Sequence, residues 1–168
     1  MRFITFSVLL GLSFASLANS VYLVRHAEKQ ASGADPALTL CGQGRADALA
    51  AYFSEHNLAA VFSTDYQRTK QTAAAVAASK QLAVTDYDPR QPATLVQQLK
   101  LVQQLKNNNQ SVLVVGHSNT VPELVTLLSG IQVSPLTEQD YAMLYQVKLA
   151  AIPSVTISRQ AYRCQNKQ

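Results

Sequence analysis

Two stretches of the sequence, far apart in the chain, share one pattern that strongly constrains the fold. Residues 21–28 read VYLVRHAE and residues 112–119 read VLVVGHSN, so each has four apolar residues, one interrupting residue and then a histidine. Short apolar runs of this kind are typical of buried strands in a parallel sheet. As inner strands of one such sheet, they would place His26 and His117 together at its carboxyl edge, where open α/β sheets bind ligands.

The rest of the chain alternates short apolar runs with longer segments of helical character, which predicts strand–helix units and a mainly parallel sheet. The last two apolar runs, separated by a turn that contains Pro153, predict an antiparallel hairpin or edge. The expected strands are residues 21–24, 59–63, 82–87, 112–115, 143–149 and 155–162, and the expected helices are residues 39–55, 67–79, 94–107 and 122–128.

The first twenty residues have the features of a secretory signal peptide. They begin with Arg2, continue through an apolar stretch and end in small residues, with cleavage expected after Ala18 or Ser20. The stretch is shorter and more polar than a membrane-spanning helix requires. We therefore expect residues 1–20 to be a signal peptide, residues 21–168 to form a single domain without a membrane span, and the protein to be periplasmic or secreted.

The amino-acid composition favours some classes of ligand over others. The chain has 168 residues, 48% of them hydrophobic, which is enough for one core. Its 14 Lys and Arg against 10 Asp and Glu become 13 against 10 without Arg2, a dispersed excess that suits a small anionic substrate better than nucleic acid. Cys41 and Cys164 have no companions at metal-ligand spacing, so no metal site is expected; whether they form a disulfide depends on a distance that the sequence does not give.

A third point at which a strand is followed by a helix adds an arginine to the two histidines. Residues 59–63 read as a strand, and the following segment places Arg68 near the start of a helix, at the same sheet edge. Guanidinium groups bind phosphate through two parallel hydrogen bonds, and imidazole can attack phosphorus and carry the phosphoryl group. Arg25, Arg68, His26 and His117 therefore predict a site for a tetrahedral dianion.

The residues at these junctions also resemble a known family. Arg25-His26-Ala27-Glu28-Lys29 resembles the Arg-His-Gly signature of the histidine phosphatase superfamily, with Ala27 where glycine is usual. Residues 35–42 resemble its Leu-Thr-x-x-Gly element, residues 62–73 its Ser-x-x-x-Arg-x-x-x-Thr-Ala element, and residues 115–120 its Gly-His-Ser element. The four elements come in the family's order and span most of the chain after residue 20.

The resemblance implies the fold and the roles of single residues. The fold would be the three-layer α/β sandwich of the phosphoglycerate mutase type, with helices on both faces of a mainly parallel sheet, and no cofactor would be needed. His26 would be the nucleophile of a metal-independent phosphatase acting on phosphate monoesters or phosphohistidine. The phosphoryl oxygens would be held by Arg25, Arg68 and His117.

The proton donor and the edge of the site remain open at the level of sequence. Asp88 is the first candidate for the acid, Glu123 the second, and phosphohistidine substrates would need none. Ser118 and Glu28 are expected to contact the substrate, although Glu28 and Lys29 also fit a solvated ion pair. Tyr66 and Tyr87 could line the pocket, but packing in the core is the simpler expectation for both. The expected surface charges are Arg45, Arg90, Arg159 and Arg163.

The same residues also favour or argue against other possible functions. A phosphate-binding protein without turnover, and a phosphomutase, would keep the same pocket. A serine hydrolase with Ser118 as nucleophile would need glycine at position 120 and a histidine after the serine, and the sequence has Thr120 and no later histidine. The three histidines are too scattered for a zinc site. The substrate and the oligomeric state are not determined by the sequence.

Overall fold

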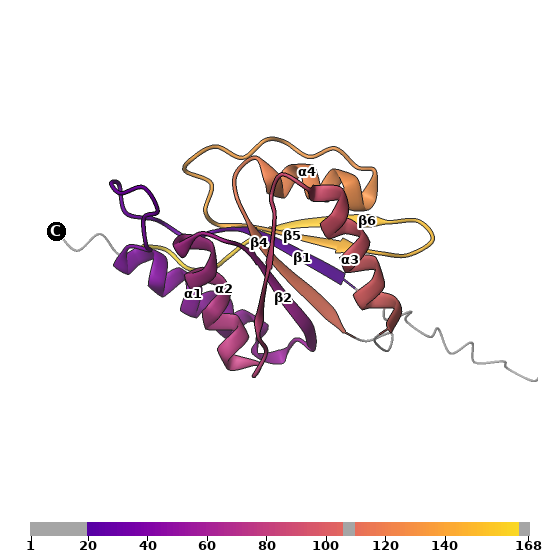
Figure 1. Cartoon of the computed structure of the whole chain (residues 1–168), viewed down its shortest axis with the longest axis horizontal. Coiled ribbons are helices and arrows are strands. Elements are labelled where there is room, and N and C mark those ends of the chain that lie inside the picture. The colour runs from indigo at the N-terminus through magenta and orange to yellow at the C-terminus, as the bar shows by residue number, and fades with distance from the viewer. Residues whose placement is uncertain (1–19, 106–109, 165–168) are drawn as a thin grey trace, which may run out of the picture.

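One six-stranded sheet organises the computed structural model, which describes residues 20–105 and 110–164 (Figure 1). The strands lie in the order β3-β2-β4-β1-β5-β6. Their bounds are Ser20–Arg25 for β1, Leu58–Thr64 for β2, Val84–Tyr87 for β3, Ser111–Gly116 for β4, Met143–Lys148 for β5 and Ser154–Arg159 for β6. The predicted signal peptide lies outside the described residues, apart from Ser20, which begins β1.

The sheet has a parallel part and an antiparallel part. Strands β3, β2, β4 and β1 run parallel, whereas β5 pairs antiparallel with β1 and with β6. The predicted mainly parallel sheet and terminal antiparallel hairpin are therefore confirmed. The four parallel strands all end at one edge, and the loops that follow them lie close together there.

Helices cover both faces of the sheet, as the α/β prediction requires. They are α1 (Leu40–Tyr52, followed by the short 3-10 helix η1, Phe53–Glu55), α2 (Gln67–Ser79), α3 (Pro92–Leu105) and α4 (Thr120–Ser129). Helices α1 and α2 lie together on one side of the sheet, and α3 and α4 lie on the other (Figure 1). No helix among the described residues is long and apolar enough to cross a membrane.

Side chains of the inner strands point alternately to the two faces of the sheet, and a hydrophobic core lies on each face. In β1, Val21 and Leu23 pack with residues of α3 and α4, and Tyr22 and Val24 pack with residues of α1 and α2. Successive side chains of a strand point to opposite faces, so a strand buried on both faces must be apolar throughout. This is why the sequence VYLV has no polar residue until the strand ends.

The first turn of α1 is packed directly against the segment that follows β1. The hydroxyl oxygen of Thr39 caps the helix by accepting from the backbone N–H of Gly42, as expected of an N-cap threonine. A Cβ atom at Gly42 would lie 2.2 Å from the carbonyl oxygen of Glu28, so only glycine fits there. Beside it, Cys41 forms a disulfide with Cys164, whose Cα atom lies 5.4 Å away, and this bond ties the C-terminal segment to α1.

Candidate active site

The two predicted histidines meet at the carboxyl edge of the sheet. Arg25 and Gly116 are opposite each other in the parallel β1–β4 pair, so His26 and His117 leave the sheet at the same level. The backbone N–H of His26 donates to the carbonyl oxygen of Gly116 at 2.9 Å, which extends the ladder by one bond. The centroids of the two imidazole rings lie 5.5 Å apart.

His26 is buried and held in one tautomer. Its Nδ1 lies 2.7 Å from the carbonyl oxygen of Ala27, which can only accept, so Nδ1 carries the proton and Nε2 has a free lone pair. Burial lowers the pKa of His26 to about 3, and the charge of Arg25 contributes in the same direction. The ring is therefore neutral at pH 7, which is the state required of a nucleophile.

His117 is oriented by a chain of hydroxyl groups. Its Nε2 lies 2.9 Å from the hydroxyl oxygen of Thr64, at the end of β2, and Thr64 in turn bonds to the hydroxyl of Thr69 on α2. Burial, followed by the charges of Arg68 and Arg25, lowers the pKa of His117 to about 4. A bound dianion would offset those charges and so favour protonation of His117 in the complex.

Both predicted arginines line the same site and keep unused donors. Arg25 is 1% exposed, with its guanidinium 4.3 Å from the centre of the Tyr141 ring, and Arg68 lies 4.4 Å from that of Tyr66. The Nε atoms of both are buried without a hydrogen-bond partner, and Gln160 has the only other such side-chain atom among the described residues. Buried donors normally have acceptors, so two orphaned guanidinium donors beside a pocket indicate an anion site.

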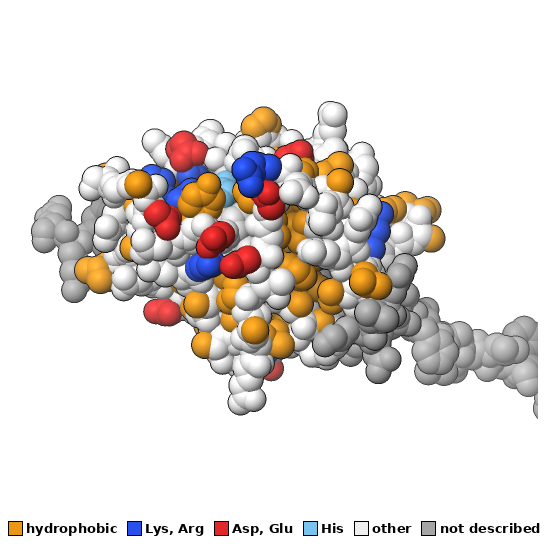
Figure 2. Space-filling view, viewed as in Figure 1, with side chains coloured by type: hydrophobic (Ala, Val, Ile, Leu, Met, Phe, Trp, Pro, Cys, Tyr) orange, Lys and Arg blue, Asp and Glu red, His pale blue; other side chains and the backbone are white. Residues whose placement is uncertain are grey.

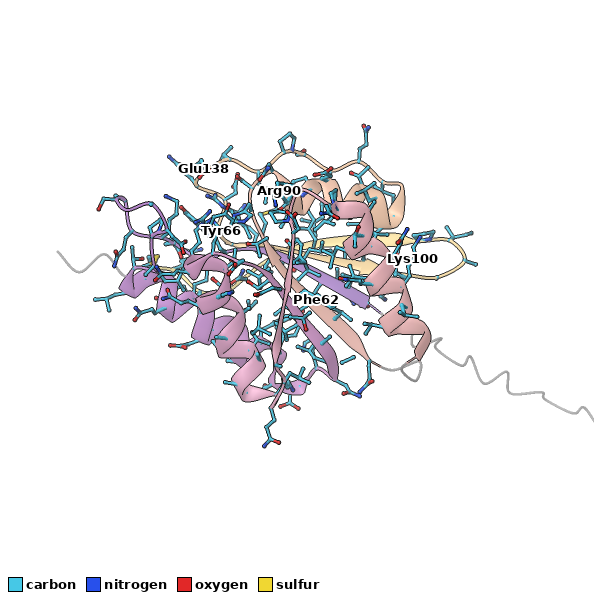
Figure 3. All side chains as sticks on the ribbon, in the orientation of Figure 1. Phe62, Tyr66, Arg90, Lys100 and Glu138 are labelled. Carbon is cyan, nitrogen blue, oxygen red and sulfur yellow. A yellow bond between two sulfur atoms is a disulfide. The ribbon has the colours of Figure 1, made fainter. Side chains whose placement is uncertain are left out.

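These groups surround an open pocket of about 370 Å³. Figure 2 shows histidine surface there between basic and acidic side chains, and in Figure 3 Tyr66, Arg90 and Glu138 lie near one another although they come from three separate segments. The lining residues are Arg25, His26, Lys29, Tyr66, Arg68, Pro89, Arg90, His117, Ser118, Asn119, Thr120 and Glu138. Of the residues predicted for the site, Arg25, His26, Arg68, His117 and Ser118 are brought together.

Glu138 is the main lining residue that the sequence did not predict. Its Oε2 accepts from Nη2 of Arg25 at 2.6 Å, and its Oε1 accepts from the hydroxyl of Ser118 at 2.7 Å. The loop between α4 and β5 brings it there, together with Thr137, whose carbonyl oxygen accepts from Nη1 of Arg25. The loop carries no strand or helix pattern, so no sequence signal pointed to it. Tyr66 is exposed and lines the pocket instead of packing in the core, whereas Tyr87 is buried in the core. Arg90 is exposed, as expected of a surface charge, and also lines the pocket.

The structure does not place the two proton-donor candidates in this pocket. Asp88 lies in a neighbouring pocket, where both its oxygens accept from the guanidinium of Arg90 at 2.9 Å. These bonds, with one from the Arg90 backbone, lower the pKa of Asp88 to about 2, so it is a carboxylate at neutral pH. Glu123 is exposed in the first turn of α4 and is not a lining residue.

Glu28 is likewise outside the pocket, contrary to the expectation that it contacts the substrate. Its carboxylate is held by the guanidinium of Arg45, with Nη2 at 2.6 Å and Nε at 2.9 Å from the nearer oxygen. Arg45 is therefore buried rather than a surface charge, and its guanidinium also packs over the ring of Tyr162. Among the described residues, one group with possible metal ligands was found, namely Glu28, Cys41 and Cys164, and its two sulfur atoms form the disulfide.

Comparison with known proteins agrees with this geometry. Residues 21–90 match the model of the histidine phosphatase superfamily, branch 1, and this range includes Arg25, His26 and Arg68. Among curated proteins, none matches the sequence significantly.

Solved structures of low sequence identity share the fold. The protein histidine phosphatase SixA, complexed with tungstate, superposes with a TM-score of 0.70 at 17% identity, over 84% of this chain and 97% of SixA. The mycobacterial glucosyl-3-phosphoglycerate phosphatase in complex with inorganic phosphate gives a TM-score of 0.64 at 12% identity, over 86% and 98% of the two chains. The predicted fold class is thereby confirmed.

Proposed function

We propose that the chain, whose residues 21–90 match the model of the histidine phosphatase superfamily, hydrolyses phosphate monoesters, or phosphohistidine, through a phosphohistidine formed on His26. The observation that carries the proposal is the state of His26. Its Nδ1–H is bound to the Ala27 carbonyl, its Nε2 is free, and its low pKa keeps the ring neutral beside two arginines.

In the first step, Nε2 of His26 attacks phosphorus. The new N–P bond forms as the bond from phosphorus to the leaving group breaks. That bond is P–O in a phosphate ester, whose oxygen leaves as the anion and takes its proton from water, and P–N in phosphohistidine, whose nitrogen leaves with the bonding electron pair. Arg25, Arg68 and His117 stabilise the negative charge on the three phosphoryl oxygens, an effect worth roughly 2.7–4 kcal/mol for each well-placed donor. In the second step, water attacks phosphorus, the N–P bond breaks, and phosphate and neutral His26 are released.

The leaving group determines which substrates are turned over well. Asp88 is ionised and bound to Arg90, and so cannot donate a proton at neutral pH. Substrates whose leaving groups depart without a strong acid, such as aryl phosphates or phosphohistidine, are therefore expected to react faster than simple alkyl phosphates. Because the two guanidinium groups supply positive charge to the phosphoryl group, the proposed reaction needs no metal ion.

Turnover of p-nitrophenyl phosphate by purified protein, in the presence of EDTA, tests the proposal. His26→Ala should lower the rate by about 10³-fold or more while leaving the fold intact. Wild type quenched in denaturant should retain phosphate that acid releases and alkali does not. Acid-stable label, or unchanged turnover in His26→Ala, would identify another nucleophile. His56→Ala is the matched control, because His56 follows η1 as its C-cap residue and is not a lining residue of the pocket.

A second candidate is a phosphate-binding protein without turnover. It is favoured by one observation, namely that neither Asp88 nor Glu123 lines the pocket as a proton donor. Absence of hydrolysis of p-nitrophenyl phosphate by wild type, combined with phosphate binding, would support this candidate, since nitrophenolate leaves without protonation.

We also propose that the protein is exported. The signal-like residues 1–20 support this, and so does the disulfide between Cys41 and Cys164, because disulfides persist in oxidising compartments. Fractionation of cells that express the full chain tests it. Recovery of uncleaved, reduced protein in the cytoplasm would contradict it.

A further inference from the structure

One carboxylate occupies the donors expected to hold a phosphoryl oxygen. Glu138 accepts from Nη2 of Arg25 and from the hydroxyl of Ser118, at 2.6 and 2.7 Å. Both donors line the pocket beside His26 and His117. A carboxylate oxygen and a phosphoryl oxygen make the same kind of charge-assisted hydrogen bond to a guanidinium, so the two compete for Arg25.

The Glu138 side chain can leave this position without unfolding the loop that carries it. It is 73% exposed, in contrast to Arg25. The loop is fixed by other bonds, because the backbone N–H and the hydroxyl of Thr137 both donate to Asp140 at 2.8 and 2.7 Å. The Thr137 carbonyl separately accepts from Arg25. Rotation of Glu138 into solvent would thus break only its own two bonds.

We propose that Glu138 is a specificity-determining residue, whose carboxylate competes with small oxyanions for Arg25 and Ser118. Free phosphate exchanges one charge-assisted hydrogen bond for another at Arg25 and so gains little. If the carboxylate stays in place, it repels the dianion directly. The inference rests on the proposed function only in taking this pocket as the phosphoryl site.

A substrate can overcome this competition through contacts that phosphate lacks. Tyr66, Pro89 and Arg90 belong both to the wall of this pocket and to that of a neighbouring pocket of about 510 Å³. A leaving group attached to the phosphoryl group can extend along these three residues. The site is therefore expected to favour phosphate esters whose leaving group reaches Arg90 over inorganic phosphate, which is also the product.

Calorimetric binding of inorganic phosphate tests the inference without requiring turnover. Glu138→Ala should bind phosphate roughly tenfold more tightly than wild type, the equivalent of one charge-assisted hydrogen bond. Glu138→Gln should lie between them, because its amide oxygen can still accept from Arg25. Glu123→Gln removes the same charge outside the pocket and should leave the affinity unchanged.

The outcomes separate this inference from the proposed function. Unchanged or weaker phosphate binding by Glu138→Ala would overturn the inference, and weaker binding with a lowered Tm would show that Glu138 only stabilises the loop. Tighter binding without hydrolysis of p-nitrophenyl phosphate by wild type would support the inference and contradict the phosphatase proposal. Absence of phosphate binding to wild type and Glu138→Ala alike would overturn the inference, whereas the phosphatase proposal is decided by turnover of p-nitrophenyl phosphate.

Discussion

The molecule has two buried arginines that each bind a glutamate at 2.6 Å, and the surroundings of the two pairs differ. Arg45 and Glu28 are both shielded, with side chains 8% and 18% exposed, and the disulfide and Tyr162 pack around them. Arg25 is shielded, whereas Glu138 is 73% exposed. The first pair is closed on both sides. The second is open toward a pocket that also contains two neutral histidines.

The difference shows that an ion pair near a site must be judged by the exposure of both partners. Separating a closed pair leaves a charge buried without compensation, so such a pair holds segments together. An open pair can exchange its exposed partner for a ligand at small cost. Here the closed pair joins the segment after His26 to α1, and the open pair marks the proposed ligand position.

Arg25→Lys should give the largest effect and should act on catalysis alone. Lysine keeps the charge but cannot replace the planar guanidinium, so kcat/KM should fall by roughly 10²- to 10³-fold. The free energy of unfolding should change little. Steady-state kinetics with p-nitrophenyl phosphate and urea unfolding measure the two quantities. A variant that loses stability but keeps its activity would reverse the roles assigned to the two pairs.

Removal of the disulfide should act on stability alone. The double variant Cys41→Ser with Cys164→Ser should lose about 2–4 kcal/mol of unfolding free energy, since the bond closes a long loop. Its kcat should stay within about twofold of wild type when measured well below the new Tm, because neither cysteine lines the pocket. A large loss of kcat in the fully folded variant would show that the closed region controls the site.

Arg45→Met should give a smaller loss of stability. Glu28 would then be a largely shielded carboxylate without its partner, which should cost about 2 kcal/mol after allowance for its partial exposure. Urea unfolding measures the loss. Adding Glu28→Gln should recover part of it, because the unpaired charge is then removed. No recovery would mean that Arg45 acts through its packing on Tyr162 instead.

Acidification should lower the free energy of unfolding through the two pocket histidines. The fold holds the pKa of His26 at about 3 and that of His117 at about 4, whereas the unfolded chain binds these protons near pH 6.5. Between pH 6.5 and pH 4 the unfolded state therefore binds more protons than the folded state. The free energy of unfolding should fall as the pH drops through this range, by at most about 1.4 kcal/mol per pH unit for each histidine. His26→Asn with His117→Asn should flatten the slope in urea unfolding at each pH, and His56→Asn should not.

The sequence predicted the site residues that lie at the ends of strands. The apolar runs that end in His26 and His117 predicted two buried parallel strands, and Arg68 was placed by the strand and helix around it. Asp88 and Glu28 were judged by their position in the chain alone, yet what each does depends on one neighbour, Arg90 and Arg45 respectively. Glu138 lies on an irregular loop far along the chain, and only the folded structure shows that it reaches Arg25.

The absence of a side chain at position 42 limits how the sequence can vary. The first turn of α1 rests on the Glu28 carbonyl with no room for even one methyl group, and that carbonyl is two residues from His26. An alanine there would have to displace either the helix or the peptide next to the nucleophile. The distance between α1 and the imidazole of His26 is thus set by contact between backbone atoms at Gly42 and Glu28. A change of side-chain rotamer cannot relieve a clash between backbone atoms.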